Sequence, residues 1–175
     1  RGILRDFDGS IDAIVCHWDF PATPIAAVLC EELGLPGPSL EAVLKCSHKY
    51  WSRLEQQKTA PEHTPRFCAV DPFDDDPLEK VSLDYPFWIK PIKGYGSMLG
   101  FRINNAHDFE HAIGIIREKI SRIGDSFNTI LSWITLPEEV RGITGNHLIA
   151  EECISGLEIA PEGSVQHGVY RAHGM

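Results

Sequence analysis

A lysine at the end of an apolar strand, followed at once by a run of glycines, constrains this chain more than any other feature. Residues 85–100 read Tyr-Pro-Phe-Trp-Ile-Lys-Pro-Ile-Lys-Gly-Tyr-Gly-Ser-Met-Leu-Gly. Polyphosphate binding needs backbone N–H groups that converge on oxygens, together with a positive point charge. Glycine suits such a loop because a side chain would hold the backbone away from the phosphates. The segment therefore predicts a strand over Phe87–Pro91, ending near Lys90, and a phosphate-binding loop over residues 93–100.

Three common nucleotide-binding loops do not fit this segment. The Walker A pattern G-x-x-x-x-G-K-[ST] is absent, and the glycine spacing G-x-G-x-x-x-G differs from the dinucleotide fingerprint. A strand at Phe101–Ile103, rather than a helix, is expected to follow the loop. Protein kinases place their lysine after the glycine loop, whereas Lys90 precedes it. An ordinary hairpin between two strands is the alternative, so this segment alone leaves nucleotide binding open.

Three more segments carry recognisable patterns. Residues 148–158 read Leu-Ile-Ala-Glu-Glu-Cys-Ile-Ser-Gly-Leu-Glu, a predicted strand that ends in E-x-x-[hydrophobic]-x-G-x-E. Residues 42–53 read Ala-Val-Leu-Lys-Cys-Ser-His-Lys-Tyr-Trp-Ser-Arg, and the turn before them, residues 34–39, reads Gly-Leu-Pro-Gly-Pro-Ser. The two glutamates at 151 and 158 alone could be ordinary surface carboxylates.

In order and spacing, the four segments resemble the ATP-grasp family, which includes biotin carboxylase and D-alanine–D-alanine ligase. The resemblance implies that Glu151 accepts a hydrogen bond from the adenine amino group. It also implies that the backbone of Cys153 and Ile154 pairs with the adenine edge, and that Glu158 binds the ribose hydroxyls. These roles suit the chemistry, since adenine needs a donor and an acceptor from extended backbone, and a ribose diol suits a carboxylate.

The resemblance also assigns the phosphate contacts. Lys49 fits the lysine of the family's D-K-x-x-x-[RK] helix, although His48 stands where the family has Asp. Lys49 and Lys90 are expected to hold the α- and β-phosphates. A flexible loop is expected to fold over the triphosphate and to contribute Lys93, Gly94, Gly96 and Ser97. This loop is shorter than the GGGG-type loop of biotin carboxylases.

Members of the family bind ATP with Mg²⁺ and transfer the γ-phosphoryl group to a carboxylate, and an amine or thiol then attacks the acylphosphate. The resemblance therefore implies an ATP-dependent ligase that uses ATP and Mg²⁺ and takes a small-molecule carboxylate as substrate. A biotin carboxylase-type subunit is one alternative, and a non-catalytic nucleotide-binding or interaction domain is another. The family's magnesium ligands are expected beyond Met175, in a C-terminal lobe. No catalytic residue or metal ligand is assigned within the chain, and the chain alone is expected to be inactive.

The expected fold class is α/β, an ATP-grasp portion with an α+β lid that follows part of a Rossmann-like domain. Residues 1–45 are expected to end that N-terminal domain, and residues 46–84 to form a connecting helix and a linker. Residues 85–154 are expected to form the lid, and residues 155–175 to begin the C-terminal lobe. A short apolar run at residues 11–16 predicts a buried parallel strand in the first of these parts.

Capping residues and hydrophobic periodicity predict the remaining elements. A helix capped by Thr23 is expected to end at Gly34, with one apolar face made by Ile25, Val28, Leu29 and Leu33. Ser39 is expected to cap the next helix, and a further helix follows it. A helix after Asn104 or Asn105 is expected to continue to residue 123, with an apolar stripe made by Phe109, Ile113, Ile116, Ile120 and Ile123. Strands are expected at Phe67–Val70 and residues 147–154, and a hairpin from residues 157–160 and 165–170.

His17, Trp18 and Asp19 follow the run at residues 11–16. They would lie at the carboxyl end of the predicted strand, where α/β sheets place ligands. Asp19 is expected to cap the next helix and Trp18 to pack against it. A contact between these residues or His17 and substrate is the alternative.

Composition excludes several classes of protein. The net charge of -9, with basic residues scattered along the chain, argues against a nucleic-acid binder. No run reaches the roughly 18 apolar residues that a membrane span needs, so no membrane partner is expected. The five cysteines show no C-x-x-C pair, which suits reduced thiols in a cytoplasmic protein. The oligomeric state stays open, with a homodimer as one option.

Overall fold

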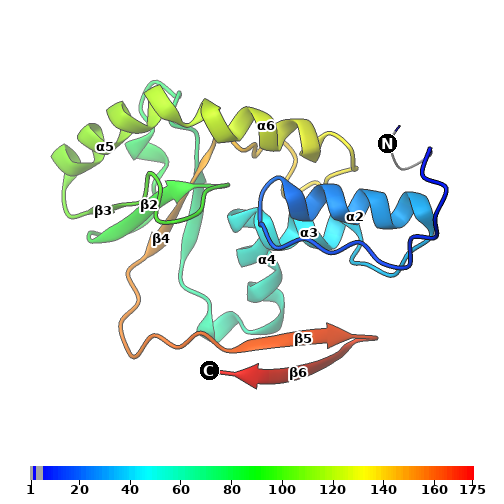
Figure 1. Cartoon of the computed structure of the whole chain (residues 1–175). Helices are drawn as coiled ribbons and strands as arrows, with labels where there is room; N and C mark the ends of the chain where they lie inside the picture. The colour runs from blue at the N-terminus through cyan, green and yellow to red at the C-terminus, as the bar shows by residue number, and fades with distance from the viewer. Residues whose placement is uncertain (1, 3–5) are drawn as a thin grey trace.

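The computed structural model describes residue 2 and residues 6–175, and its centre is a four-stranded antiparallel sheet (Figure 1). The strand order is β1-β4-β2-β3, with bounds Phe67–Val70 for β1, Leu148–Glu152 for β4, Phe87–Pro91 for β2 and Phe101–Ile103 for β3. All four strands lie where the sequence predicts them, and β4 is shorter than the expected span. Strand β2 pairs antiparallel with β4, although about 60 residues of the chain separate the two strands.

The register between β2 and β4 decides which side chains share a face of the sheet. Trp88 lies opposite Glu151, and Lys90 lies opposite Ile149. Because alternate residues of a strand point to the same side, Trp88, Lys90 and Glu151 share one face. Phe87 and Ile89, which alternate with Trp88 and Lys90 along β2, are buried and face the opposite side. The sheet therefore has one mainly apolar face, with Glu152 at its edge, and one face that mixes core with polar groups.

The apolar face is covered by helix α5 (Ala106–Lys119). Asn105 caps this helix, as expected, by accepting a hydrogen bond from the backbone N–H of Asp108 at 2.9 Å. Phe109, Ile113 and Ile116 of the predicted stripe are buried and pack on the sheet, together with Ala112. The expected single helix to residue 123 is wrong, because a second helix, α6 (Ser121–Leu131), starts after Ile120. Ile123 consequently packs in the second core, on the other face of the sheet.

The second core lies between the other sheet face and helices α3 (Leu40–Ser47), α4 (Lys49–Thr59) and α6. Its members include Phe20, Leu44, Trp51, Ile92, Phe127 and Ile149. Ser39 caps α3 as predicted, since its hydroxyl accepts from the backbone N–H of Ala42 at 3.2 Å. Two short 3₁₀ helices, η1 (Pro61–His63) and η2 (Leu78–Lys80), flank β1.

The expected parallel strand at residues 11–16 is wrong. These residues form neither helix nor strand, and Val15 is 91% exposed. A strand needs a neighbour for its backbone N–H and C=O groups, and within residues 6–175 the run pairs with no other strand. The apolar composition of the run therefore does not place it in a sheet.

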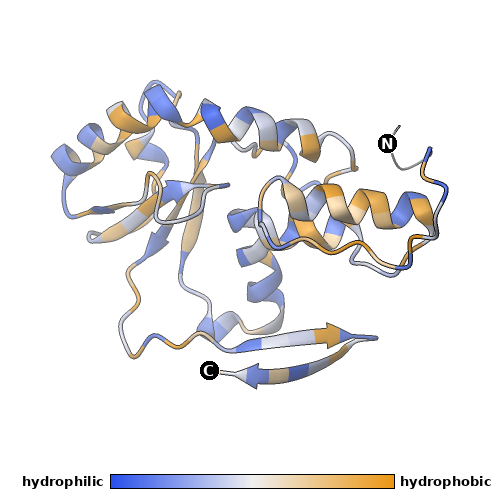
Figure 2. Cartoon of the chain, viewed as in Figure 1, coloured by the Kyte–Doolittle hydropathy of each residue, from blue (hydrophilic) through white to orange (hydrophobic). Residues whose placement is uncertain are grey.

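Helix α2 (Ala22–Leu33) begins earlier than expected and differs in its cap and in its buried face. The Thr23 hydroxyl donates to the carbonyl of Trp18 at 3.0 Å instead of capping the helix. Although α2 is apolar along most of its length (Figure 2), Ile25 and Leu33 are each 41% exposed. The buried side chains are Pro24, Ala27 and Cys30. Gly34 ends the helix as predicted, with a φ of 66°.

The C-terminal hairpin exists but is displaced from the expected positions. Its strands are β5 (Glu162–Gln166) and β6 (Val169–Gly174), and it lies apart from the four-stranded sheet (Figure 1). The predicted strand over residues 165–170 is wrong, because His167 and Gly168 form the turn with φ values of 50° and 77°. Residues 157–160 form no strand. A two-residue turn with positive φ at both positions matches the twist of a hairpin. The turn at His167 and Gly168 therefore sets the position of both strands.

The expected division of the chain stays a prediction, with one qualification. Strand β1 pairs with β4, so a boundary between residues 84 and 85 would separate two hydrogen-bonded strands of one sheet. No helix in the described part of the chain is long and apolar enough to cross a membrane.

Candidate functional site

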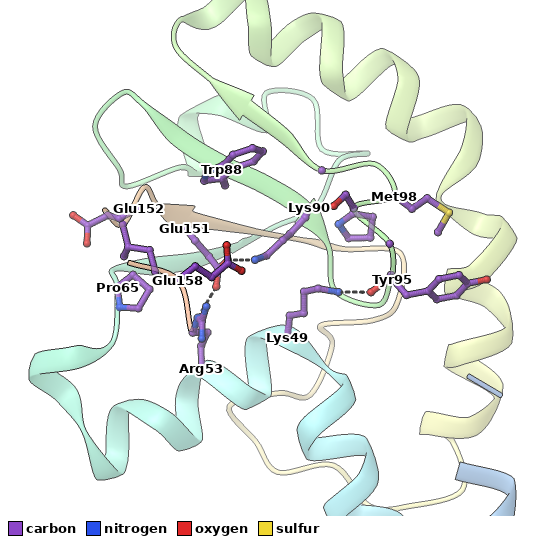
Figure 3. Close-up of a pocket in the computed structure, with 16 residues that line it drawn as sticks. Lys49, Arg53, Pro65, Trp88, Lys90, Tyr95, Met98, Glu151, Glu152 and Glu158 are labelled. Carbon is purple, nitrogen blue, oxygen red and sulfur yellow. Dashed lines mark hydrogen bonds and ion pairs between the residues drawn. The ribbon is translucent and has the colours of Figure 1, made fainter. Parts of the chain in front are cut away.

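A cavity of about 690 Å³ opens where the polar side of the sheet, helix α4 and the glycine loop meet (Figure 3). The sheet contributes Trp88, Lys90 and Glu151. Helix α4 contributes Lys49 and Arg53, and the segment before β1 contributes Pro65. A volume of several hundred Å³ is typical of sites for small molecules and cofactors.

The buried carboxylate of Glu151 lies at the centre of the cavity wall. Glu151 is only 4% exposed, and one of its oxygens forms an ion pair with Lys90 Nζ. The other oxygen accepts a hydrogen bond from Arg53 Nε at 2.5 Å. A buried carboxylate is tolerated when it is paired and hydrogen-bonded in this way. Because a carboxylate offers about four acceptor positions, Glu151 can still accept a further hydrogen bond.

Lys49 lies in the first turn of α4 and reaches the glycine loop. Its Nζ donates to the carbonyl of Gly94 at 2.8 Å. Burial lowers the pKa of Lys49 to about 8, and the positive charges of Lys90 and Lys93 add to the effect. These neighbours destabilise the charged form of Lys49 in the absence of an anion. The arrangement suits a ligand that brings negative charge.

The glycine loop turns tightly over residues 93–100. Gly96, Ser97 and Leu99 have φ values of 58°, 57° and 55°. The backbone N–H of Met98 donates to the carbonyl of Tyr95, and the N–H of Gly100 donates to the carbonyl of Ser97, both at 3.2 Å. Only glycine adopts positive φ without strain, so Gly96 fits the turn that brings the loop over the cavity.

The segment after β4 closes the other side of the cavity. Ile154 and Glu158 both line it, and both are exposed to solvent. Glu152 also lines it, although its carboxylate is bound by Arg66, whose Nε lies 2.6 Å from Oε1. Figure 3 shows Glu158 directed toward the same space as Lys90 and Glu151. A strand-end lysine and a distant carboxylate thus share one cavity, as the sequence predicts.

Comparison with solved structures identifies the architecture. The chain superposes over 92% of its length on an L-amino acid ligase from Bacillus licheniformis, with a TM-score of 0.63 and 21% identity, covering 31% of that protein. It superposes over 86% of its length on the D-alanine–D-alanine ligase of Helicobacter pylori, with a TM-score of 0.55 and 16% identity, covering 39% of it. For the D-alanine–D-alanine ligase of Bacillus anthracis the values are 80%, 0.51, 15% and 38%.

These three ligases are ATP-grasp enzymes. The chain has the ATP-grasp fold. At these identities the likeness establishes the fold alone, and the chain spans about a third of the length of the ligases it matches. No protein-family model matches the sequence, and no curated protein shows a significant sequence match.

The cavity between the sheet, α4 and the glycine loop contains most of the residues that the sequence predicts. Eight of the ten line it: Lys49, Lys90, Gly94, Gly96, Ser97, Glu151, Ile154 and Glu158. Their individual roles toward a nucleotide remain predictions. Cys153 lies outside the lining, although only its backbone was expected to contribute. Lys93 also lies outside it and faces a second cavity.

Arg53 and Trp88 line the cavity but were not among the predicted site residues. Arg53 lies four residues after Lys49, so both project from one side of a helix. Trp88 lies two residues before Lys90, so both project from one face of a strand. The sequence could have indicated both residues. Counting four residues along the helix from Lys49 leads to Arg53, and counting two residues along the strand from Lys90 leads to Trp88.

Proposed function

We propose that the chain binds ATP in this cavity and supplies the nucleotide-binding portion of an ATP-dependent ligase. The observation that carries the proposal is that Glu158, which is far from Lys90 and the glycine loop in sequence, lines the same cavity as they do. The ligases with the same fold support it. The phosphates would lie between Lys49, Lys90 and the loop amides, which offer positive charge and N–H donors.

The adenine would lie against Trp88, at the sheet end of the cavity. Trp88 is 43% exposed and presents an aromatic surface beside Glu151. Stacking of a base on an aromatic ring contributes about 1–3 kcal/mol. Glu151 would accept from the amino group, the backbone at Cys153 and Ile154 would pair with the base edge, and Glu158 would hold the ribose.

In the proposed reaction, ATP phosphorylates a carboxylate, and an amine or thiol then displaces phosphate from the acylphosphate. Positive charge and positioning are the protein's main contributions to phosphoryl transfer, and the cavity lysines offer both. The solved structures are named as ligases of amino acids. Their names favour a carbon–nitrogen ligase over a biotin carboxylase-type subunit.

The residues described here do not fit a magnesium site of their own. Among residues 6–175, no group of three or more His, Cys, Asp or Glu side chains is placed to hold a metal ion. In the cavity, Glu151 and Glu152 are already bound by cationic side chains. ATP carries Mg²⁺ in reactions of this class.

Calorimetric titration with ATP tests the proposal. Lys90→Met, Trp88→Ala and Glu158→Ala are each expected to weaken ATP binding about tenfold or more, because each removes a contact worth about 1–3 kcal/mol. Trp88→Ala should weaken AMP binding as strongly as ATP binding, whereas Lys90→Met should affect ATP more than adenosine.

Two exposed α5 residues outside the cavity provide matched controls, Lys119→Met and Glu118→Ala. These substitutions change charge in the same way and should leave the affinity for ATP unchanged. Two results would refute a nucleotide site at this position. One is that all three cavity variants bind ATP as tightly as the unsubstituted protein, and the other is that the α5 controls lose as much affinity as the cavity variants.

A further inference from the structure

Lys93 begins the glycine loop but points away from the nucleotide cavity. Its side chain is 4% exposed, and its Nζ donates to Asp19 Oδ2 at 3.0 Å. It faces a second cavity, of roughly 530 Å³, which lies beside Thr23 and Ser47. The resemblance to ATP-grasp proteins implied a phosphate contact for Lys93, and this orientation does not provide one.

Two aromatic rings complete the surroundings of the Lys93 ammonium group. Its Nζ lies 5.3 Å from the ring centroid of Phe20 and 6.0 Å from that of Phe127. The two rings meet edge to face at 5.9 Å. A buried ammonium group is unfavourable unless it is paired, and cation–π contacts add to the stabilisation by a carboxylate. Three separate parts of the chain thus provide a site for this one cation: the segment before α2, helix α6 and the loop itself.

The backbone around Lys93 is also held on both sides. The N–H of Ile92 donates to the carbonyl of His147 at 3.0 Å, and the carbonyl of Ile92 accepts from the backbone N–H of Lys49 at 3.1 Å. On the other side, the carbonyl of Gly94 accepts from Lys49 Nζ. The start of the loop is therefore fixed.

The tip of the loop is held differently. Tyr95 is 48% exposed, and the tip's own backbone hydrogen bonds join residues within the loop. The segment with positive φ begins at Gly96. A segment with exposed side chains and only local backbone bonds opens at a lower free energy than its buried surroundings.

We propose that Lys93 is a positioning residue that anchors the start of the glycine loop to Asp19 and α6, so that loop motion begins after it. This inference rests on the proposed function only in that the moving tip would close over ATP. The anchor itself is a property of the protein without nucleotide. The segment before α2 sets the position from which the loop reaches the cavity.

Hydrogen exchange of the nucleotide-free protein tests the anchor directly. Lys93→Met should raise the exchange rate of amides 94–100 about tenfold, while amides of α5 and β4 keep their rates. Asp19→Asn should raise the same rates, because it removes the carboxylate partner. The double variant should exchange no faster than the faster single variant, and Lys93→Arg should restore most of the protection. Lys119→Met serves as the control, since it removes an exposed lysine charge on α5 without touching the anchor.

A second measurement separates anchoring from direct phosphate binding. An anchor predicts that Asp19→Asn weakens ATP binding in the same direction as Lys93→Met. A phosphate ligand predicts that Asp19→Asn releases Lys93 and strengthens ATP binding, with unchanged loop exchange in both single variants. That second pattern would overturn the proposal.

The tests of the anchor and of the proposed function can fail separately. Should the protein bind no ATP, the proposed function fails, and loop exchange still decides the anchor. If Lys93→Met unfolds the chain, the exposed partner Asp19 provides the milder variant, and unchanged loop exchange in Asp19→Asn overturns the proposal.

Discussion

Raising the pH from 7 to 9 is expected to weaken ATP binding about tenfold through Lys49 alone. The pKa of Lys49 is lowered to about 8, mainly by burial. The charged form outnumbers the neutral form about ten to one at pH 7, and the ratio is reversed at pH 9. Only the charged form attracts phosphate, so the contribution is present below the folded-state pKa and is lost as the pH rises through it. An ordinary lysine would keep its charge throughout this interval.

The assay is calorimetric titration with ATP at pH 7, 8 and 9 and constant ionic strength. Lys49→Arg is the matched control, because its guanidinium keeps its charge and can still reach the carbonyl of Gly94. Its affinity should be nearly independent of pH. Lys49→Met should bind weakly at every pH, close to the level of the unsubstituted protein at pH 9. All other residues are the same in the three proteins, so their contribution to the pH dependence cancels.

Either of two results would refute this reasoning. A pH-independent affinity of the unsubstituted protein would mean that Lys49 stays charged or does not contact phosphate. An equal pH dependence in Lys49→Arg would assign the effect to another group.

Two further predictions concern stability. Gly124→Ala should lower the melting temperature despite the higher helix propensity of Ala, since an added Cβ would lie 1.7 Å from Asn146 Oδ1; Gly114→Ala, with open space in α5, should stabilise the chain by about 0.5–1 kcal/mol. His48 is buried and neutral, with its pKa lowered chiefly by burial, and its Nδ1 accepts from the N–H of Trp51 at 3.1 Å. Chemical denaturation should therefore show stability falling as the pH drops below about 6.5, and His48→Asn should remove that slope whatever its effect at pH 7.

Local patterns predicted the sheet well because its strands carry their own signals. Strand β2 is mainly apolar and ends at Pro91, just before the glycine loop, and β4 ends at the two glutamates Glu151 and Glu152. The hairpin was misplaced for a local reason too. The expected strands left residues 161–164 for the turn, whereas His167 and Gly168 form it, and of these two only the glycine is a strong turn signal.

The run at residues 11–16 shows where local pattern stops being sufficient. An apolar run of this length can belong to a buried strand or to an exposed segment, and only a partner distinguishes them. The same limit applies to Lys93. Its position beside the glycines indicates a phosphate ligand, but its side chain turns to Asp19 and Phe127, which no spacing in the sequence connects to it.

The charges of the cavity lysines explain why the cavity would favour a ligand with negative charge, such as a nucleotide. The pKa of Lys49 falls from 10.5 to about 8, a change of 2.5, which corresponds to about 3 kcal/mol of unfavourable free energy for its charge. Glu151 and Asp19 each neutralise one neighbouring lysine, and Lys49 has only a neutral carbonyl. Of Lys49, Lys90 and Lys93, only Lys49 has no carboxylate partner among the described residues. A bound phosphate would therefore stabilise the charged form of Lys49. The unfavourable free energy of the Lys49 charge would then contribute to the free energy of nucleotide binding, and ATP binding near pH 8 should be accompanied by proton uptake.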